Sequence, residues 1–100
     1  MSYYEKAINT TRERFELNAF MYKQIGRKVA YYRQLRELTQ EQLASRIHIS
    51  TSSISRIERG KYNNNIPLSM LMVIAEGLKI DLAMLVTFNE QEKKIRWDGL

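Results

Sequence analysis

Hydrophobic residues recur at helical spacing through the middle of the chain. Ile25, Val29 and Tyr32 are separated by four and three residues, so they form one stripe on a helix that we expect to end near Leu38. Three further apolar clusters follow at comparable spacing. They are Leu43, Ala44 and Ile47; Ile54 and Ile57; and Leu71, Ile74, Ala75 and Leu78. Strand-like alternation is scarce, so the pattern predicts an all-α domain built from short helices.

Residues that start and stop helices separate these clusters. Thr39 stands before the second cluster and is expected to be the N-cap of a second helix. Ser50 is a good N-cap for a third helix, which we expect to run from about Thr51 to Arg59 and to stop at Gly60.

The same reasoning extends towards the C-terminus. Residues 61–67 are expected to form a loop, and a fourth helix follows. Asp81 is expected to cap a short fifth helix that contains Leu82 and Leu85. Five short helices therefore fit between residues 23 and 86.

The two ends of the chain are less clearly patterned. Ala7, Ile8, Thr11 and Phe15 can form the stripe of a helix within the first 20 residues. We therefore expect a helical extension over residues 1–22, the main domain over 23–87 and a tail over 88–100. Within the tail, residues 95–97 fit either a strand or a frayed helix, and the pattern leaves both open.

Composition excludes several classes of function. The chain has no cysteine, which removes disulfides, thiolate nucleophiles and cysteine zinc sites. It has no apolar stretch near the roughly 18 residues of a membrane span, and its first residues lack the apolar segment of a signal peptide. We expect a soluble, cytoplasmic protein without a membrane partner.

Positive charge is concentrated in one part of the chain. The net charge is +5, and residues 24–60 hold seven Arg or Lys against three acids, an excess of four. A concentrated basic surface is typical of proteins that bind polyanions, but charge alone fits a solubilising surface equally well. On the expected third helix, one side gathers only polar or basic residues. They are Ser52, Ser55, Arg56 and Arg59.

Several short motifs in fixed order resemble the phage-repressor and Cro family, also called XRE. They are LTQEQLA at 38–44, Ile49-Ser50, and ISRIERG at 54–60, followed by Pro67, Leu71, Ile74-Ala75, Leu78 and Leu85. The resemblance covers about 65 residues without an insertion, which is more specific than one short pattern. It implies a compact five-helix lambda-repressor-like domain whose third helix enters the major groove of DNA.

The resemblance also implies roles for individual residues. Gln40 resembles a glutamine that grips a DNA phosphate and braces the recognition helix, while Thr51 and Ser52 stand where base edges are contacted. Arg56 fits either a bidentate guanine contact or a phosphate clamp, and the loop that begins at Lys61 fits either backbone contacts or a plain surface. The implied DNA-binding residues are Gln40, Ser50, Thr51, Ser52, Ser55, Arg56, Arg59, Lys61, Tyr62 and Asn63.

Arg33 and Glu58 look like a catalytic pair, but the resemblance implies a partly buried structural ion pair between the first and third helices. His48 departs from the family, which usually has glycine after the second helix. Histidine tolerates positive φ better than most residues, so we expect the turn to survive. As the one histidine in a chain without cysteine, it offers no metal or catalytic site, and we expect no cofactor.

The leading hypothesis is a transcriptional regulator, with repression the expected mode, that binds a palindromic operator in double-stranded DNA as a homodimer. The alternative is an antitoxin or another protein-interaction module of the same fold, in which a protein partner matters more than DNA. An enzyme would need a nucleophile with a base, or a metal site, and none is found. Two candidate dimer surfaces carry aromatic residues and methionines: Phe15, Phe20 and Met21 in the extension, and Met84, Phe88 and Trp97 near the C-terminus.

Overall fold

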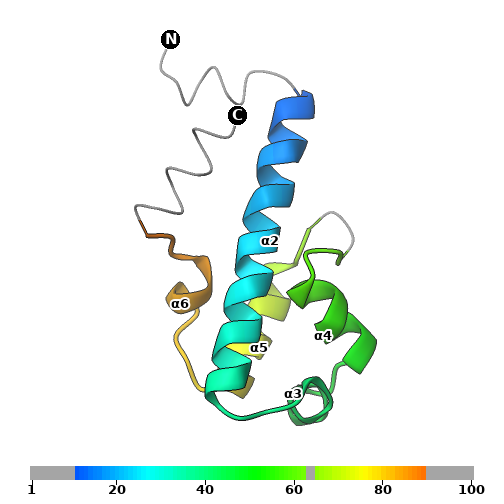
Figure 1. Cartoon of the computed structure of the whole chain (residues 1–100), viewed down its shortest axis with the longest axis vertical. Helices are drawn as coiled ribbons and strands as arrows, with labels where there is room; N and C mark the ends of the chain where they lie inside the picture. The colour runs from blue at the N-terminus through cyan, green and yellow to red at the C-terminus, as the bar shows by residue number, and fades with distance from the viewer. Residues whose placement is uncertain (1–10, 63–64, 90–100) are drawn as a thin grey trace.

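The computed structural model describes residues 11–62 and 65–89, and these residues form five α-helices and no strand (Figure 1). The helices are α2 (Thr11–Leu35), α3 (Gln40–Ile47), α4 (Thr51–Glu58), α5 (Leu68–Leu78) and α6 (Ala83–Val86). The expected all-α class is confirmed. Four predicted features lie outside the described residues: the helix before residue 11, the contact at Asn63, the strand or helix at 95–97, and the dimer contact at Trp97.

The first helix is longer than the pattern predicted. α2 runs without interruption for 25 residues, about 37 Å, and crosses the expected boundary between residues 22 and 23. Its N-terminal half extends beyond the other helices (Figure 1). α2 ends at Leu35 rather than near Leu38, because Glu37 adopts left-handed backbone geometry with φ 57°. The N–H of Leu38 then bonds back to the carbonyl of Arg33 at 3.1 Å, which turns the chain towards α3.

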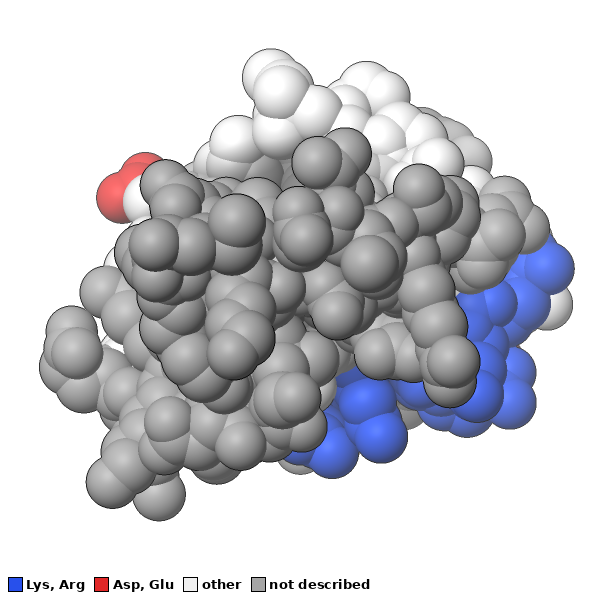
Figure 2. Space-filling model, turned by 90° about the horizontal axis from the view of Figure 1, so that it is seen from above, with Lys and Arg blue, Asp and Glu red and all other residues white. Residues whose placement is uncertain are grey.

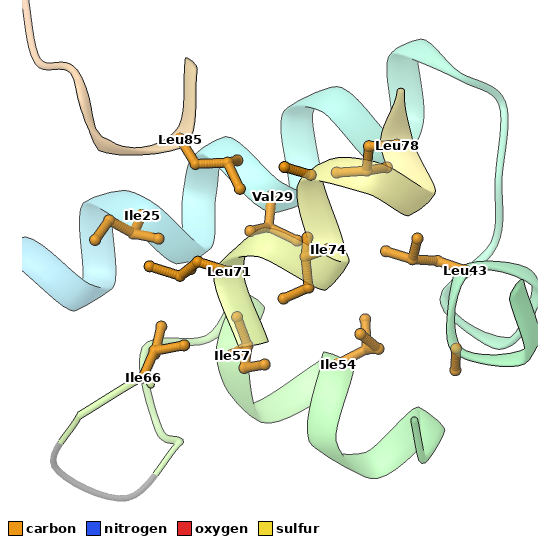
Figure 3. Close-up of a cluster of buried hydrophobic side chains, with 12 residues drawn as sticks. Ile25, Val29, Leu43, Ile54, Ile57, Ile66, Leu71, Ile74, Leu78 and Leu85 are labelled. Atoms are coloured by element: carbon orange, nitrogen blue, oxygen red, sulfur yellow. The ribbon is translucent and has the colours of Figure 1, made fainter. Parts of the chain in front are cut away.

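The core forms where α2, α4 and α5 meet, and α3 and α6 close its sides (Figures 1 and 3). The buried apolar residues are Ile25, Val29, Leu43, Ala44, Ile54, Ile57, Ile66, Leu71, Ile74, Ala75, Leu78 and Leu85. The predicted stripes supply all of them except Ile66, which comes from the loop before α5. Tyr32, Ile47 and Leu82, which were also expected inside, are half-buried against this core. Burying each large side chain contributes about 1.5 to 3 kcal/mol.

Two of the predicted helix caps are confirmed. The Oγ1 atom of Thr39 accepts a hydrogen bond from the N–H of Gln42 at 3.0 Å, and the Gln42 side chain accepts one from the N–H of Thr39 at 2.8 Å. The Ser50 hydroxyl accepts from the N–H of Ser53 at 3.1 Å. These bonds satisfy N–H groups that the first turns of α3 and α4 would otherwise leave unpaired.

The predicted cap at Asp81 is wrong. α6 begins at Ala83, and Leu82, with helical backbone angles, occupies the cap position without a side-chain hydrogen bond. The Asp81 backbone carbonyl accepts from the N–H of Met84 at 2.9 Å, so a tight turn starts this helix. With four residues, α6 is held by the burial of Leu85 rather than by a cap.

Four helices end in a left-handed residue, and one of the four is glycine. The residues are Glu37, His48, Gly60 and Lys79, with φ between 55° and 70°. The residue after each donates its N–H to a carbonyl five positions earlier, at 2.7 to 3.1 Å. The expectation that His48 would take positive φ is therefore confirmed, and the strain that glycine avoids is present at three positions.

We expect His48→Gly to stabilise the domain by about 1 kcal/mol, because glycine adopts this geometry without the steric cost of a Cβ atom. For a domain of this size, the thermal midpoint should rise by about 4 to 8 °C in a circular dichroism melt. His48→Ala keeps the Cβ atom and should give no such rise. Equal midpoints for the glycine and alanine variants would show that the turn is unstrained.

Candidate nucleic-acid interface

α4 presents two chemically different faces. Ile54 and Ile57 are fully buried on its inner face. On the outer side, Ser52, Arg56 and Arg59 are exposed, and Thr51 and Ser55 are half-buried. α4 packs against both α2 and α3, and His48, Ile49 and Ser50 connect α3 to α4. The helix is therefore anchored on one side and open to a ligand on the other.

A hydrogen-bonded network joins α2, α3 and α4. The Nε atom of Arg33 donates to Oε2 of Glu58 at 2.7 Å, and a second guanidinium nitrogen donates to Oε1 at 3.1 Å. The third guanidinium nitrogen donates to the Leu38 carbonyl at 2.7 Å. The side chains of Arg33 and Glu58 are only 12% and 6% exposed, so this bidentate pair is held away from water.

Gln40 belongs to the same network. As the first residue of α3, it donates from Nε2 to Oε1 of Glu58 at 3.1 Å. The amide is thus fixed between α3 and the end of α4. This contact is consistent with the bracing role that the family resemblance implies, and the phosphate contact of Gln40 stays a prediction.

Arg56 and Tyr62 form a pair that sequence reasoning did not find. The guanidinium carbon of Arg56 lies 5.7 Å from the centre of the Tyr62 ring, and the ring itself packs against the core. A guanidinium over an aromatic face is attracted by the ring quadrupole. Tyr62 therefore supports the Arg56 side chain at the surface. Lys61, next to it, is exposed.

Gly26 permits the close approach of α2 to α4. A Cβ atom at this position would collide with the backbone carbonyl oxygen of Ile57 and lie 3.0 Å from that of Glu58. A glycine inside a helix lowers stability by about 1 kcal/mol relative to alanine. Its presence within the helical pattern was therefore the sign in the sequence that this position needs a small residue. This contact determines how closely α4 packs against α2.

Part of the basic excess in residues 24–60 serves the fold. Arg36 donates to the carbonyls of Leu78 and Lys79 at 2.9 and 3.0 Å, and Arg46 donates to that of Gly77 at 3.2 Å. Both cations thus bind carbonyls at the C-terminal end of α5, where positive charge is favoured. Together with the ion-paired Arg33, they account for three of the seven basic residues.

Basic side chains nevertheless lie together on the face of the molecule that Figure 2 shows. Seen along α2 from its N-terminal end, Lys and Arg side chains line the edge that lies on the α4 side of Figure 1, and an acidic side chain marks the opposite edge (Figure 2). This asymmetry, with the exposed polar face of α4, describes a surface suited to a polyanion.

No three His, Asp or Glu side chains among the described residues come together as metal ligands. None of the described helices is long and apolar enough to cross a membrane.

Comparisons with known proteins agree with this geometry. The sequence model of a family described as helix-turn-helix matches residues 29–85. An uncharacterized HTH-type transcriptional regulator from Methanocaldococcus jannaschii is 41% identical over 54 residues, which are 54% of this chain and 82% of that protein. The immunity repressor protein of Bacillus phage phi105 is 37% identical over 62 residues, which are 62% of this chain but only 42% of the repressor. No solved structure matches.

Proposed function

Because the chain belongs to the phage-repressor type of helix-turn-helix family, whose members are DNA-binding transcriptional regulators, we propose that it represses transcription by binding a palindromic operator as a homodimer. The observation that carries the proposal is the exposed polar face of α4, opposite the buried Ile54 and Ile57. A helix enters the major groove only when its outer face can donate to phosphates and base edges.

The residues of this face fall into two groups, those that contact base edges and those that contact the DNA backbone. Thr51 and Ser52, at the N-terminal end of α4, contact base edges, as N-terminal residues of a recognition helix do. Arg56 reaches a guanine, and its contact with Tyr62 orients the guanidinium for that bond. The backbone contacts are assigned to Gln40, Ser50, Ser55, Arg59, Lys61, Tyr62 and Asn63.

Dimerisation supplies the discrimination that one short helix lacks. Two half-sites one helical turn apart, about 34 to 36 Å, bring two recognition helices to one face of the duplex. Of the apolar residues suggested for this contact, Met84 is 39% exposed on α6, as is its neighbour Val86. Phe20, Met21 and Phe88 are half-buried, and Phe88 packs on the core. We therefore assign the dimer contact to the α6 side.

Selection from a pool of random duplexes tests the proposal. The expected product is a palindrome whose half-sites are separated by about 10 base pairs, bound by two copies of the chain. Affinity should fall steeply as salt rises, because phosphate contacts release counterions. A copurifying protein together with salt-insensitive DNA binding would support the antitoxin or protein-interaction alternative instead.

The same selection repeated with Arg56→Ala tests the role of Arg56. We expect the preference for guanine at one position of each half-site to disappear, with a loss of about 1 to 3 kcal/mol in operator affinity. Tyr62→Phe keeps the ring beneath the guanidinium and should keep the guanine preference, although it removes the hydroxyl assigned to a backbone contact. If Arg56→Ala weakens all duplexes alike and lowers the salt dependence, Arg56 is a phosphate clamp.

A further inference from the structure

Lys23, which the sequence analysis did not assign to any site, lies against the end of α4. Gly60, with φ 70°, follows α4, and a Cβ atom there would lie 3.0 Å from Cα of Lys23, 3.1 Å from its Cβ and 3.2 Å from its Cγ. The stem of Lys23 is therefore packed beside the C-terminal end of α4. The residue as a whole is exposed, so its ammonium group extends into solvent.

Three other exposed cations lie close to this contact. Arg27 is one turn along α2 from Lys23, and side chains four residues apart on a helix are neighbours, about 6 Å apart. Arg59 and Lys61 flank Gly60 and are exposed. We call these four residues, Lys23, Arg27, Arg59 and Lys61, the cation ridge. It is assembled from two segments that are more than 30 positions apart in the sequence.

The ridge is not neutralised within the described structure. None of its members forms an ion pair with a described residue, although the Nε atom of Arg59 bonds to the Ser55 carbonyl at 3.3 Å. The carboxylate nearest in sequence, Glu58, is already bound by Arg33 and Gln40. A surface that serves only solubility usually mixes charges of both signs, whereas these four are all positive.

We propose that the cation ridge binds phosphates of the DNA backbone beside the groove that α4 enters. The inference rests on the proposed function. When the N-terminal residues of a recognition helix face base edges, its C-terminal end comes near the backbone at the side of the groove. The ridge lies at that end, so the N-terminal helix joins the recognition helix in holding the duplex. These contacts are to phosphates and carry no base preference of their own.

The test uses the full chain with Lys23→Gln, Arg27→Gln and the double substitution. Glutamine keeps the Cβ and Cγ atoms that pack on Gly60 and removes the charge. The slope of log affinity against log salt should become shallower by about 0.9 for each lost contact in each bound copy. For the double variant, the affinity lost between 50 and 200 mM salt should then be about tenfold smaller per bound copy. The selected base sequence should stay the same.

A matched control and a located probe separate the outcomes. Lys79→Gln removes one charge at the C-terminal end of α5, beside Arg36, and should leave the slope unchanged. Replacing phosphates beside each half-site by neutral methylphosphonates should lower the affinity of the wild type. The same replacement should cause no additional loss of affinity in the double variant, which already lacks these contacts.

Each possible result decides between the two proposals. A double variant with the same thermal midpoint, the same selected base sequence and the same salt slope as the wild type would overturn the proposal for the cation ridge but not the proposed function. Loss of affinity with equal methylphosphonate sensitivity in both proteins would also overturn the ridge. A wild type that binds no duplex would overturn the proposed function, and the ridge with it.

Discussion

Glu58→Ala is expected to lower the free energy of unfolding by about 3 to 5 kcal/mol, because it leaves the buried guanidinium of Arg33 without its carboxylate. Gln40 loses its acceptor at the same time. Of the hydrogen bonds described for the Arg33 side chain, only the one to the Leu38 carbonyl remains. For a domain of this size the thermal midpoint should fall by at least about 12 °C.

A double variant distinguishes the destabilisation caused by an unpaired buried charge from the net stabilisation that the ion pair provides. Arg33→Met with Glu58→Leu replaces both charges by apolar groups of similar length, and its stability should lie much nearer the wild type. The single variant Glu58→Ala also tests whether Glu58 takes part in DNA recognition. At a temperature where this variant remains folded, its base preference should match that of the wild type. Unchanged thermal stability of Glu58→Ala would refute the structural role of the ion pair.

Gly26→Ala is expected to cost about 3 kcal/mol and to weaken operator binding, although alanine is the better helix former by about 1 kcal/mol. The new methyl group meets the carbonyl oxygen of Ile57, and a backbone atom cannot rotate away. α4 must then move outward from α2, which displaces its outer face relative to α3. Chemical denaturation measures the first effect, and titration of the selected operator measures the second.

Gly77→Ala is the matched control for this substitution. Its methyl group would meet the Cγ2 methyl group of the half-buried Ile47, a side-chain atom rather than a backbone carbonyl. The loss of stability should therefore be smaller, and operator affinity should follow the fraction of folded protein. A Gly26→Ala variant at least as stable as the wild type would show that the close approach of α2 and α4 is unnecessary.

Features set by a few neighbouring residues could be predicted from the sequence. The caps at Thr39 and Ser50 follow from local chemistry, and the inward side of α4 follows from the spacing of Ile54 and Ile57. Asp81 shows the limit of such reasoning, since a capping side chain acts only if the helix begins at the next residue. Here α6 begins at Ala83, where the packing of Leu85 allows it.

Contacts between distant segments carry no periodic signal. The ion pair of Arg33 with Glu58 spans 25 positions, and it was expected only because of the resemblance to a family. The packing of Lys23 on Gly60 and the bonds of Arg36 to the end of α5 had no such guide. Charge counting therefore overstated the positive charge in residues 24–60 that is available to a ligand and overlooked a cation on α2.

If the proposed function holds, the two faces of α4 assign stability and DNA recognition to different side chains. Ile54, Ile57 and Glu58 fasten the helix, whereas the outward residues Ser52 and Arg56 contribute no buried surface to the core. Substitutions at such exposed positions usually change stability by no more than about 0.5 kcal/mol. Point mutations at these positions can therefore change the DNA sequence that a descendant of this chain recognises while the fold stays intact. The evolution of new target sites is then not limited by the requirement to fold.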